Sequence, residues 1–266
     1  MNHVLVSSAF DDLRSRDLRF LQEAARFGEV HALLETDAAV CARTGRPPRF
    51  PYAERLYFLQ AVRFVQAVHP YGGASSLPPL GFPPDLWVLR EADNVAARQA
   101  AAQSGIAWRV LPEAQLDGFP APGIRPSSGR KKVVVTGCYD WLHTGHIAFF
   151  EEVAALGDVY VCLGNDANIR ELKGEGHPLF KASERLFVTG AIRHVTEALV
   201  STGRGWMDAE QEILHHIRAD IYAVNEDGDK PEKAAFCRRH GIQYAVLRRT
   251  PKAGLAPRSS TLLRGF

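Results

Sequence analysis

The chain has little cysteine and no long hydrophobic run. Its four cysteines, Cys41, Cys138, Cys162 and Cys237, stand far apart and form no Cys-X-X-Cys pair, which argues against a disulfide framework and against structural zinc. No apolar stretch approaches the ~20 residues that cross a bilayer. The first residues lack the basic and apolar segments of a secretory signal. These absences predict a cytoplasmic protein without a membrane partner.

Neither sign of charge dominates. The 32 lysines and arginines nearly balance the 30 acidic residues, leaving a formal net charge of +2, so the charge does not favour nucleic acid as a partner. With 46% hydrophobic and 23% charged residues the composition is that of an ordinary globular protein. A length of 266 residues allows one large or two small domains.

One short segment carries the clearest functional pattern. The apolar run 133–136 is followed by Gly-Cys-Tyr-Asp at 137–140 and by His-Thr-Gly-His at 143–146. This order predicts a strand, a tight turn and a helix whose first turn places both histidines on one face. A helix N-terminus offers amide donors and a partial positive charge, and Gly145 lets a ligand approach the backbone. The segment therefore predicts a site for nucleotide phosphates.

Residues 137–146 resemble the G-X-F-D…H-X-G-H signature of the cytidylyltransferase-like nucleotidyltransferases. This superfamily includes glycerol-3-phosphate and ethanolamine-phosphate cytidylyltransferases and heptose-phosphate adenylyltransferases. Residues 249–250 and 254–261 are similar to its R-T-X-G-[IV]-S-T-T segment. Lys173 and Arg185 stand where the family places its lysine and its helical arginine. The resemblance covers about residues 131–266.

The two halves of the chain repeat each other. At an offset of 129 residues, Phe20 and Gly28 match Phe149 and Gly157, and residues 53–56 match 183–186 one residue later. Such ordered matches indicate a tandem duplication. We expect a degenerate nucleotidyltransferase-like domain at 1–112, a linker rich in proline, glycine and serine at 113–130, and a catalytic domain at 131–266.

The first copy lacks the histidine motif. Its equivalent positions hold Arg14, Ser15, Arg16 and Asp17. An aspartate at a helix N-terminus repels phosphate, and arginine in place of Gly145 fills the space that a nucleotide needs. We expect this copy to be catalytically silent and to serve in support, in packing against the second copy, or in a homodimer.

The second copy alternates between two periodicities. Apolar runs predict strands at 133–136, 159–164, 198–201, 221–224 and 244–247, with helices at 145–156, 183–195, 207–217 and 231–240. Such alternation predicts right-handed crossovers and a parallel sheet, with ligands at the carboxyl ends of the strands. The fold class is therefore α/β, with two tandem Rossmann-like modules.

The resemblance and the local chemistry together assign roles to individual residues. Lys173 is alternatively a solvated loop lysine, Arg185 a partner of Glu184, and the hydroxyls at 259–261 helix caps. Arg55, which keeps the place of Arg185 in the silent copy, favours a partly structural role for Arg185. The expected catalytic residues are His143, His146, Lys173 and Arg258, and the expected nucleotide contacts are Thr136, Gly137, Tyr139, Asp140, Gly145, Arg185, Asn225, Asp227, Arg249, Thr250, Ser259, Ser260 and Thr261.

The resemblance implies attack by a substrate phosphate on the α-phosphorus of a nucleoside triphosphate, with magnesium accompanying the triphosphate. The acceptor is expected to be a small phosphorylated alcohol, amino alcohol or sugar. Arg249-Thr250 favours CTP, whereas Asn225-Glu226 departs from the Gly-X-Asp segment of related enzymes and leaves the base open. The alternatives are an adenylyltransferase that uses ATP and a non-catalytic nucleotide-binding protein.

Overall fold

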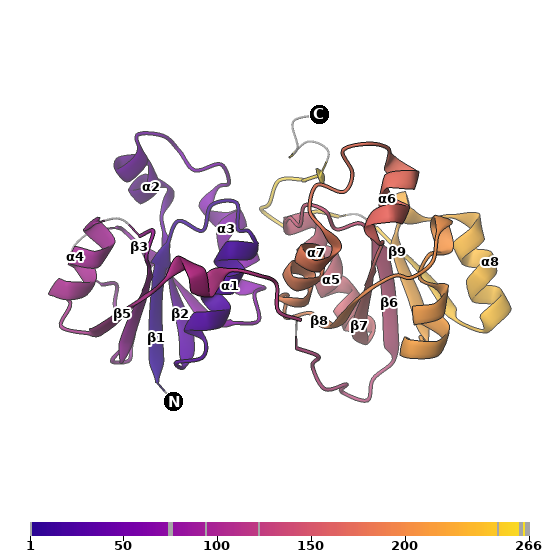
Figure 1. The fold of residues 1–266 in the computed structure, drawn as a ribbon, viewed down its shortest axis with the longest axis horizontal. Coiled ribbons are helices and arrows are strands. Elements are labelled where there is room, and N and C mark those ends of the chain that lie inside the picture. Colours follow the sequence, from indigo (N-terminus) through magenta and orange to yellow (C-terminus); the bar gives the residue numbers. More distant parts are fainter. Residues whose placement is uncertain are drawn as a thin grey trace. The chain divides into compact units, whose positions relative to one another are not determined.

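The computed structural model describes residues 2–73, 77–93, 95–121, 123–248, 250–260 and 263. The chain divides into two compact units, residues 1–119 and 120–266. Each unit contains a five-stranded, all-parallel sheet flanked by helices (Figure 1). The predicted α/β fold with two Rossmann-like modules is confirmed.

In the first unit the strand order is β3-β2-β1-β4-β5. The chain crosses from one strand to the next through helices, as parallel pairing requires. The strands are β1 (His3–Ser8), β2 (Glu29–Glu35), β3 (Val65–Tyr71), β4 (Leu86–Arg90) and β5 (Ala107–Leu111), and the helices are α1 (Ser15–Ala24), α2 (Asp37–Thr44), α3 (Tyr52–Gln60), α4 (Val95–Gln103) and the 3₁₀ turn η1 (Glu113–Leu116).

The second unit has the order β10-β9-β6-β7-β8, which is the same topology read from the opposite edge. Strand order therefore reverses between β6 and β9, and ligands bind at such switch points. The strands are β6 (Lys132–Gly137), β7 (Asp158–Leu163), β8 (Val195–Val200), β9 (Ile221–Asn225) and β10 (Gln243–Leu247), and the helical elements are α5 (Thr144–Leu156), α6 (Asp166–Lys173), α7 (Ala182–Gly190), η2 (Gly205–Met207), η3 (Glu212–Ile217), η4 (Glu226–Gly228) and α8 (Pro231–His240).

Three predicted elements need correction. The helix expected at 183–195 ends at Gly190, because the apolar residues Ile192 and Val195 belong to the turn and to β8. The helix expected at 207–217 is π-helical over 212–217, after a 3₁₀ turn at 205–207. Lys173 is the last residue of α6 rather than part of a loop. This helix was missed although Asn165 caps it, its side chain accepting from the amide of Asn168 at 2.9 Å.

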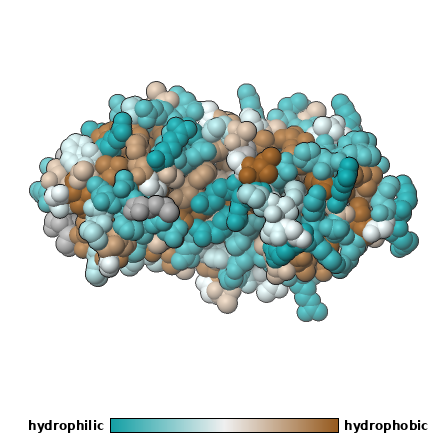
Figure 2. All heavy atoms as spheres, turned by 90° about the horizontal axis from the view of Figure 1, so that it is seen from below, coloured by the Kyte–Doolittle hydropathy of each residue, from teal (hydrophilic) through white to brown (hydrophobic). Residues whose placement is uncertain are grey.

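The surface gives no sign of a membrane-spanning segment. No helix among the residues that the structure describes is long and apolar enough to cross a bilayer. On the face shown in Figure 2, hydrophobic residues lie in scattered patches among hydrophilic ones.

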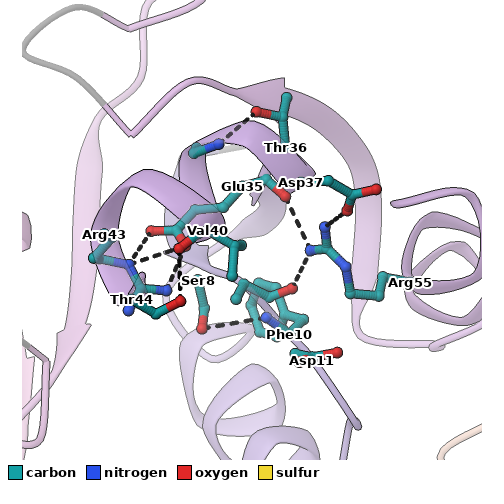
Figure 3. A network of polar contacts seen from close by, with 12 residues as sticks. Ser8, Phe10, Asp11, Glu35, Thr36, Asp37, Val40, Arg43, Thr44 and Arg55 are labelled. Carbon is teal, nitrogen blue, oxygen red and sulfur yellow. Dashed lines mark hydrogen bonds and ion pairs between the residues drawn. The ribbon is translucent and has the colours of Figure 1, made fainter. Parts of the chain in front are cut away.

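A buried arginine joins several loops in the first unit. The guanidinium of Arg55 donates to the carbonyl oxygens of Phe50 (2.9 Å), Ala9 (2.5 Å) and Glu35 (2.9 Å), and to the carboxylate of Asp37 (2.6 Å). Only 1% of its side chain is exposed. Figure 3 shows the guanidinium reaching the chain that follows β2. The arginine thus ties together the segments that follow β1 and β2.

Arg185 makes the same contacts in the second unit. It donates to the carbonyl oxygens of Phe180 (3.0 Å), Cys138 (2.7 Å) and Gly164 (2.8 Å), and to the carboxylate of Asp166 (2.7 Å). Its side chain is likewise 1% exposed. The network occurs with and without the histidine motif, so its common function is to hold the loops at the carboxyl ends of the strands.

We expect Arg185→Ala to lower the free energy of unfolding of the second unit by about 3–5 kcal/mol, because it strands buried carbonyl groups and removes the partner of Asp166. Urea denaturation measures the change. Arg55→Ala should act similarly on the first unit, whereas Arg204→Ala, whose side chain is 73% exposed beside Glu171, should leave the unfolding midpoint in place. An unchanged midpoint in Arg185→Ala would contradict the scaffold role.

Candidate functional site

A cavity of about 350 Å³ lies in the second unit at the carboxyl ends of β6 and β9. Thr136 and Gly137 end β6 and line it, and Asn225 lines it from the end of β9. The hydroxyl of Thr136 is also hydrogen-bonded to the hydroxyl of Tyr222 at 2.7 Å. The cavity thus lies at the reversal of strand order, where the sheet leaves room for a ligand.

The two histidines stack at the start of α5. The rings of His143 and His146 lie 3.9 Å apart between centroids, with 29° between their planes, and both line the cavity. His143 is the N-cap rather than a residue of the first turn, and its Nδ1 accepts a hydrogen bond from the amide of Gly145 at 3.1 Å. An acceptor at Nδ1 places the proton of a neutral imidazole on Nε2. His143 therefore offers Nε2–H as a donor.

The turn before α5 is tightly built. Tyr139 has a φ of 46°, and a Cβ at Gly137 would lie 2.8 Å from the Tyr139 ring, so glycine is required there. The carboxylate of Asp140 accepts from the amides of Leu179 (2.8 Å) and Phe180 (2.9 Å). Asp140 therefore anchors the loop before α7, although it also lines the cavity.

The C-terminal segment approaches the histidine turn. A Cβ at Gly145 would lie 3.6 Å from the carbonyl oxygen of Arg258, and the Ser260 hydroxyl is 3.3 Å from the carbonyl oxygen of Trp141, to which it donates. Ser260 lines the same cavity as the histidines. The two motifs, far apart in the sequence, are neighbours in the structure.

A second cavity, of about 300 Å³, adjoins the first. Gly145, Phe149 and Asn225 line both cavities. The predicted site residues Thr250, Arg258 and Ser259 line the second one, together with Leu255 and other residues of the C-terminal segment. The first cavity, beside the histidines, is therefore the more polar compartment, and the second has more apolar side chains in its lining.

The predicted residues divide into three groups. Arg185 lies outside both cavities, and its guanidinium is bound to the protein, so the expected phosphate contact is not found. Arg249 and Thr261 lie outside the described residues. The other predicted residues line one or both cavities, namely Thr136, Gly137, Tyr139, Asp140, His143, Gly145, His146, Lys173, Asn225, Asp227, Thr250, Arg258, Ser259 and Ser260.

Sequence reasoning missed one buried lysine. Lys233, in the first turn of α8, lines the first cavity and is 8% exposed. Its Nζ donates to the carbonyl oxygen of Gly228 at 3.2 Å and lies 5.6 Å from the centre of the Tyr222 ring. Burial lowers the pKa of its ammonium group, although Asp208 and other carboxylates oppose this shift. Lys233 shares the inward face of α8 with Phe236 and Cys237. This helical spacing is the one sequence signal that could have identified it.

His177 was also missed. It lines the first cavity from the loop between α6 and α7, together with Lys173 at the end of α6. The cavity therefore has basic side chains from α6 and from the loop after it, which suits it to a polyanion.

Side chains of the first unit fill the helix start that corresponds to the histidine turn. The Asp17 carboxylate accepts from the backbone amide of Arg14 at 2.9 Å and from the guanidinium of Arg90 at 2.5 Å. Asp17 thereby occupies the start of α1. At the carboxyl ends of the strands, Glu35 and Arg43 form a bidentate pair (Figure 3). A smaller cavity of about 250 Å³ remains at the ends of β1 and β4, lined by Ser8, Glu35, Arg43 and other residues, but by no histidine or lysine of the described part of the chain.

Comparison with known proteins agrees with this geometry. Residues 134–250 match the model of the family described as cytidylyltransferase-like. The second unit belongs to the cytidylyltransferase-like superfamily of nucleotidyltransferases.

This cytidylyltransferase-like chain has relatives named bifunctional protein HldE. It is 32% identical over 138 residues to the one from Azotobacter vinelandii, covering 51% of this chain and 27% of that protein. It is 30% identical over 191 residues to the one from Streptomyces coelicolor, covering 70% of this chain and 34% of that protein. The chain thus spans about a third of the length of these relatives.

A solved structure also matches. It is the lipopolysaccharide core biosynthesis protein of Thermoplasma volcanium, 24% identical, with a TM-score of 0.40, and the match covers 47% of this chain and 99% of that protein.

We expect Lys233→Met to weaken triphosphate binding by about 10- to 100-fold, because a hydrogen bond to a charged group contributes about 1.5–3 kcal/mol. Since burial disfavours the charged ammonium, the same change should raise the thermal midpoint of the ligand-free protein. Calorimetric titration and thermal unfolding measure the two effects. Lys131→Met, at an exposed residue just before β6, is the matched control. Equal triphosphate affinity in Lys233→Met and the native protein would remove Lys233 from the site.

Proposed function

We propose that the second unit transfers a nucleoside monophosphate from a magnesium-bound nucleoside triphosphate to a small phosphorylated acceptor and releases pyrophosphate. The supporting observation is that the stacked histidines and the 258–260 segment border adjoining cavities with shared lining residues. A polyphosphate held between them would contact both motifs. Ser260 even lines the cavity of the histidines itself, whereas two cavities without shared lining residues would have left the proposal without a basis.

The proposed reaction needs no protein nucleophile. An oxygen of the acceptor phosphate forms a bond to the α-phosphorus, and the bond from that phosphorus to the bridging oxygen breaks. The electron pair leaves with pyrophosphate, so no proton has to move. Negative charge grows on the bridging oxygen, and donors placed there lower the barrier. His143, whose Nε2 carries the proton, and His146 beside it are proposed as those donors.

The remaining basic residues are proposed to hold the phosphates. Lys173 and Lys233 border the cavity of the histidines, and Arg258 borders the adjoining one. Their positive charges would offset the charge of the triphosphate and of the acceptor phosphate. Magnesium enters with the triphosphate, a cation that binds phosphate oxygens with few protein ligands.

The second cavity is proposed to take the base and ribose. Phe149, Leu255 and Ala256 give it apolar contacts, while Asn225 and Ser259 provide hydrogen-bonding groups. This division leaves the polar compartment to the phosphates. It also makes the C-terminal segment the part of the chain that selects the base.

The identity of the base rests on two opposing signals. Arg249-Thr250 favours CTP in the sequence, but Arg249 lies outside the described residues. The similarity to HldE proteins favours ATP, the donor of the heptose-phosphate adenylyltransferases within the resemblance. We propose ATP and a phosphorylated sugar as the first pair to test, with CTP as the second donor.

A pyrophosphate-release assay tests the activity. The purified chain with magnesium is given ATP, CTP, UTP or GTP together with a panel of phosphorylated sugars, alcohols and amino alcohols. We expect release with one preferred donor and acceptor. His146→Ala should lower turnover on the order of 10²-fold, because it removes a donor to the transition state.

His215→Ala, at an exposed residue of η3, is the matched control and should retain full turnover. Tight triphosphate binding without pyrophosphate release across the whole panel would instead support the non-catalytic nucleotide-binding alternative. Equal turnover in His146→Ala and the native protein would refute the proposed role of the histidines.

A further inference from the structure

Three histidines of the first unit lie on neighbouring strands of its sheet. His3 is on β1, His31 on β2 and His69 on β3. His3 is directly opposite Glu29 in the sheet, and His31 follows Glu29 by two residues. Side chains two apart along a strand share a face, so Glu29 and His31 both point to the side of His3. The three strands thus bring four potential metal ligands together.

The ligand atoms are close enough to share one ion. His3 Nδ1 is 3.1 Å from His31 Nε2 and 3.8 Å from a carboxylate oxygen of Glu29. The ligand atoms of these three residues all lie within 4.8 Å of one another. Two imidazoles bound to one tetrahedral zinc ion, at about 2.0–2.1 Å each, hold their nitrogens about 3.3 Å apart. The two imidazoles need only a small opening to accept the metal, while the Glu29 carboxylate, 3.8 Å from His3 Nδ1, would move inward.

His69 is placed to orient His31. The other ring nitrogen of His31, Nδ1, is 3.3 Å from Nε2 of His69. Metal-binding histidines commonly donate their second N–H to an acceptor, which fixes the ring and the tautomer, and Nε2 of His69 can serve as that acceptor here. His31 itself is 6% exposed, and burial disfavours a charged imidazole.

We propose that His3, Glu29 and His31 bind one divalent transition-metal ion of the zinc type, with His69 as the positioning residue. Two imidazoles and one carboxylate form a ligand set that suits such ions, and they leave a fourth position for water. In the ion-free protein a proton can bridge the nitrogens of His3 and His31. The metal would take the place of that proton and link β1 to β2.

The second unit has the same fold without these metal-ligand residues, so the fold does not require them. Its register places Lys132 where the first unit has His3, Asp158 where it has Glu29, and Tyr160 where it has His31. Asp158 there accepts from the side chains of Ser127 (2.8 Å) and Ser128 (2.6 Å). The histidines are thus a feature of the first unit alone.

The covering of this face also differs between the units. In the second unit Ile213 and Ile217 of η3 belong to the hydrophobic cluster that contains Tyr160. In the first unit no helix occurs among the described residues between β3 and β4. Phe82 packs there instead, with its ring centre 4.2 Å from that of His31 and 4.4 Å from that of His3. Aromatic packing alone is therefore the competing explanation.

Metal titration separates the two explanations. The full chain is prepared without a polyhistidine tag, stripped with a chelator, and titrated with Zn²⁺ by calorimetry and with Co²⁺ by visible absorption. We expect His3→Gln and Glu29→Gln each to weaken metal binding on the order of 10²-fold, and His69→Gln to weaken it about 10-fold. Zn²⁺ should raise the thermal midpoint of the native protein, and this increase should vanish in the first two variants.

His216→Gln is the matched control, because that histidine is exposed and forms a two-member pair with Glu197 at 3.0 Å. It should leave the affinity unchanged. Zinc bound by His143 and His146 would stay bound in all four variants. Such binding therefore cannot explain a loss of affinity in His3→Gln or Glu29→Gln. His3 and Glu29 are about a third exposed, so their variants should fold, which far-ultraviolet circular dichroism verifies. Native metal affinity in both His3→Gln and Glu29→Gln, or no saturable binding by the native chain, would overturn the metal site in favour of aromatic packing.

Discussion

The reversal of strand order between β6 and β9 is the constraint on which the site depends. Parallel strands on either side of this point send their chains to opposite faces of the sheet, so their carboxyl ends border an open space. The turn after β6 directs the start of α5 into that space. Gly137 is needed there because the Tyr139 ring occupies the place of any side chain. The histidines and the lysines can line one cavity only because this space is kept open.

Buried polar contacts join the loops around that space. Arg185 links the chain after β6, the chain after β7 and the start of α7 through three carbonyl oxygens and a carboxylate. Asp140 adds two further bonds to backbone amides. A planar guanidinium with several fixed donors suits such convergent carbonyls. Rigid loops are what a site needs when it works by positioning and charge.

The first unit keeps this scaffold, but its cavity is smaller, about 250 Å³, and no histidine or lysine among the described residues lines it. Arg55 repeats the bonds of Arg185, and Asp11 accepts from the amides of Arg49 and Phe50 as Asp140 does from its own partners. Asp17 and Arg90 nevertheless occupy the helix start. The arginine network that holds the loops is therefore common to both units, while the residues that line the cavities differ.

The sequence alone was sufficient for features that depend on local pattern. Apolar runs and glycine stops predict all five strands of the second unit, and the matches at a constant offset indicate the duplication. The histidine turn was recognisable because its residue types follow one another directly. The predicted helix boundary was wrong where one apolar pattern runs through two elements, as at Ile192 and Val195. Periodicity shows which side chains are buried, but not where the backbone changes from helical to strand hydrogen bonding.

Only the tertiary structure decided which side chains meet. It assigned Arg185 to the scaffold and Lys233 to the cavity, because burial and hydrogen-bond partners depend on the packing of segments far apart in the chain. It also brought His3, Glu29 and His31 together across two strands, a juxtaposition set by sheet register. Local sequence specifies the conformation of each segment; the pairing of strands determines which segments share a site.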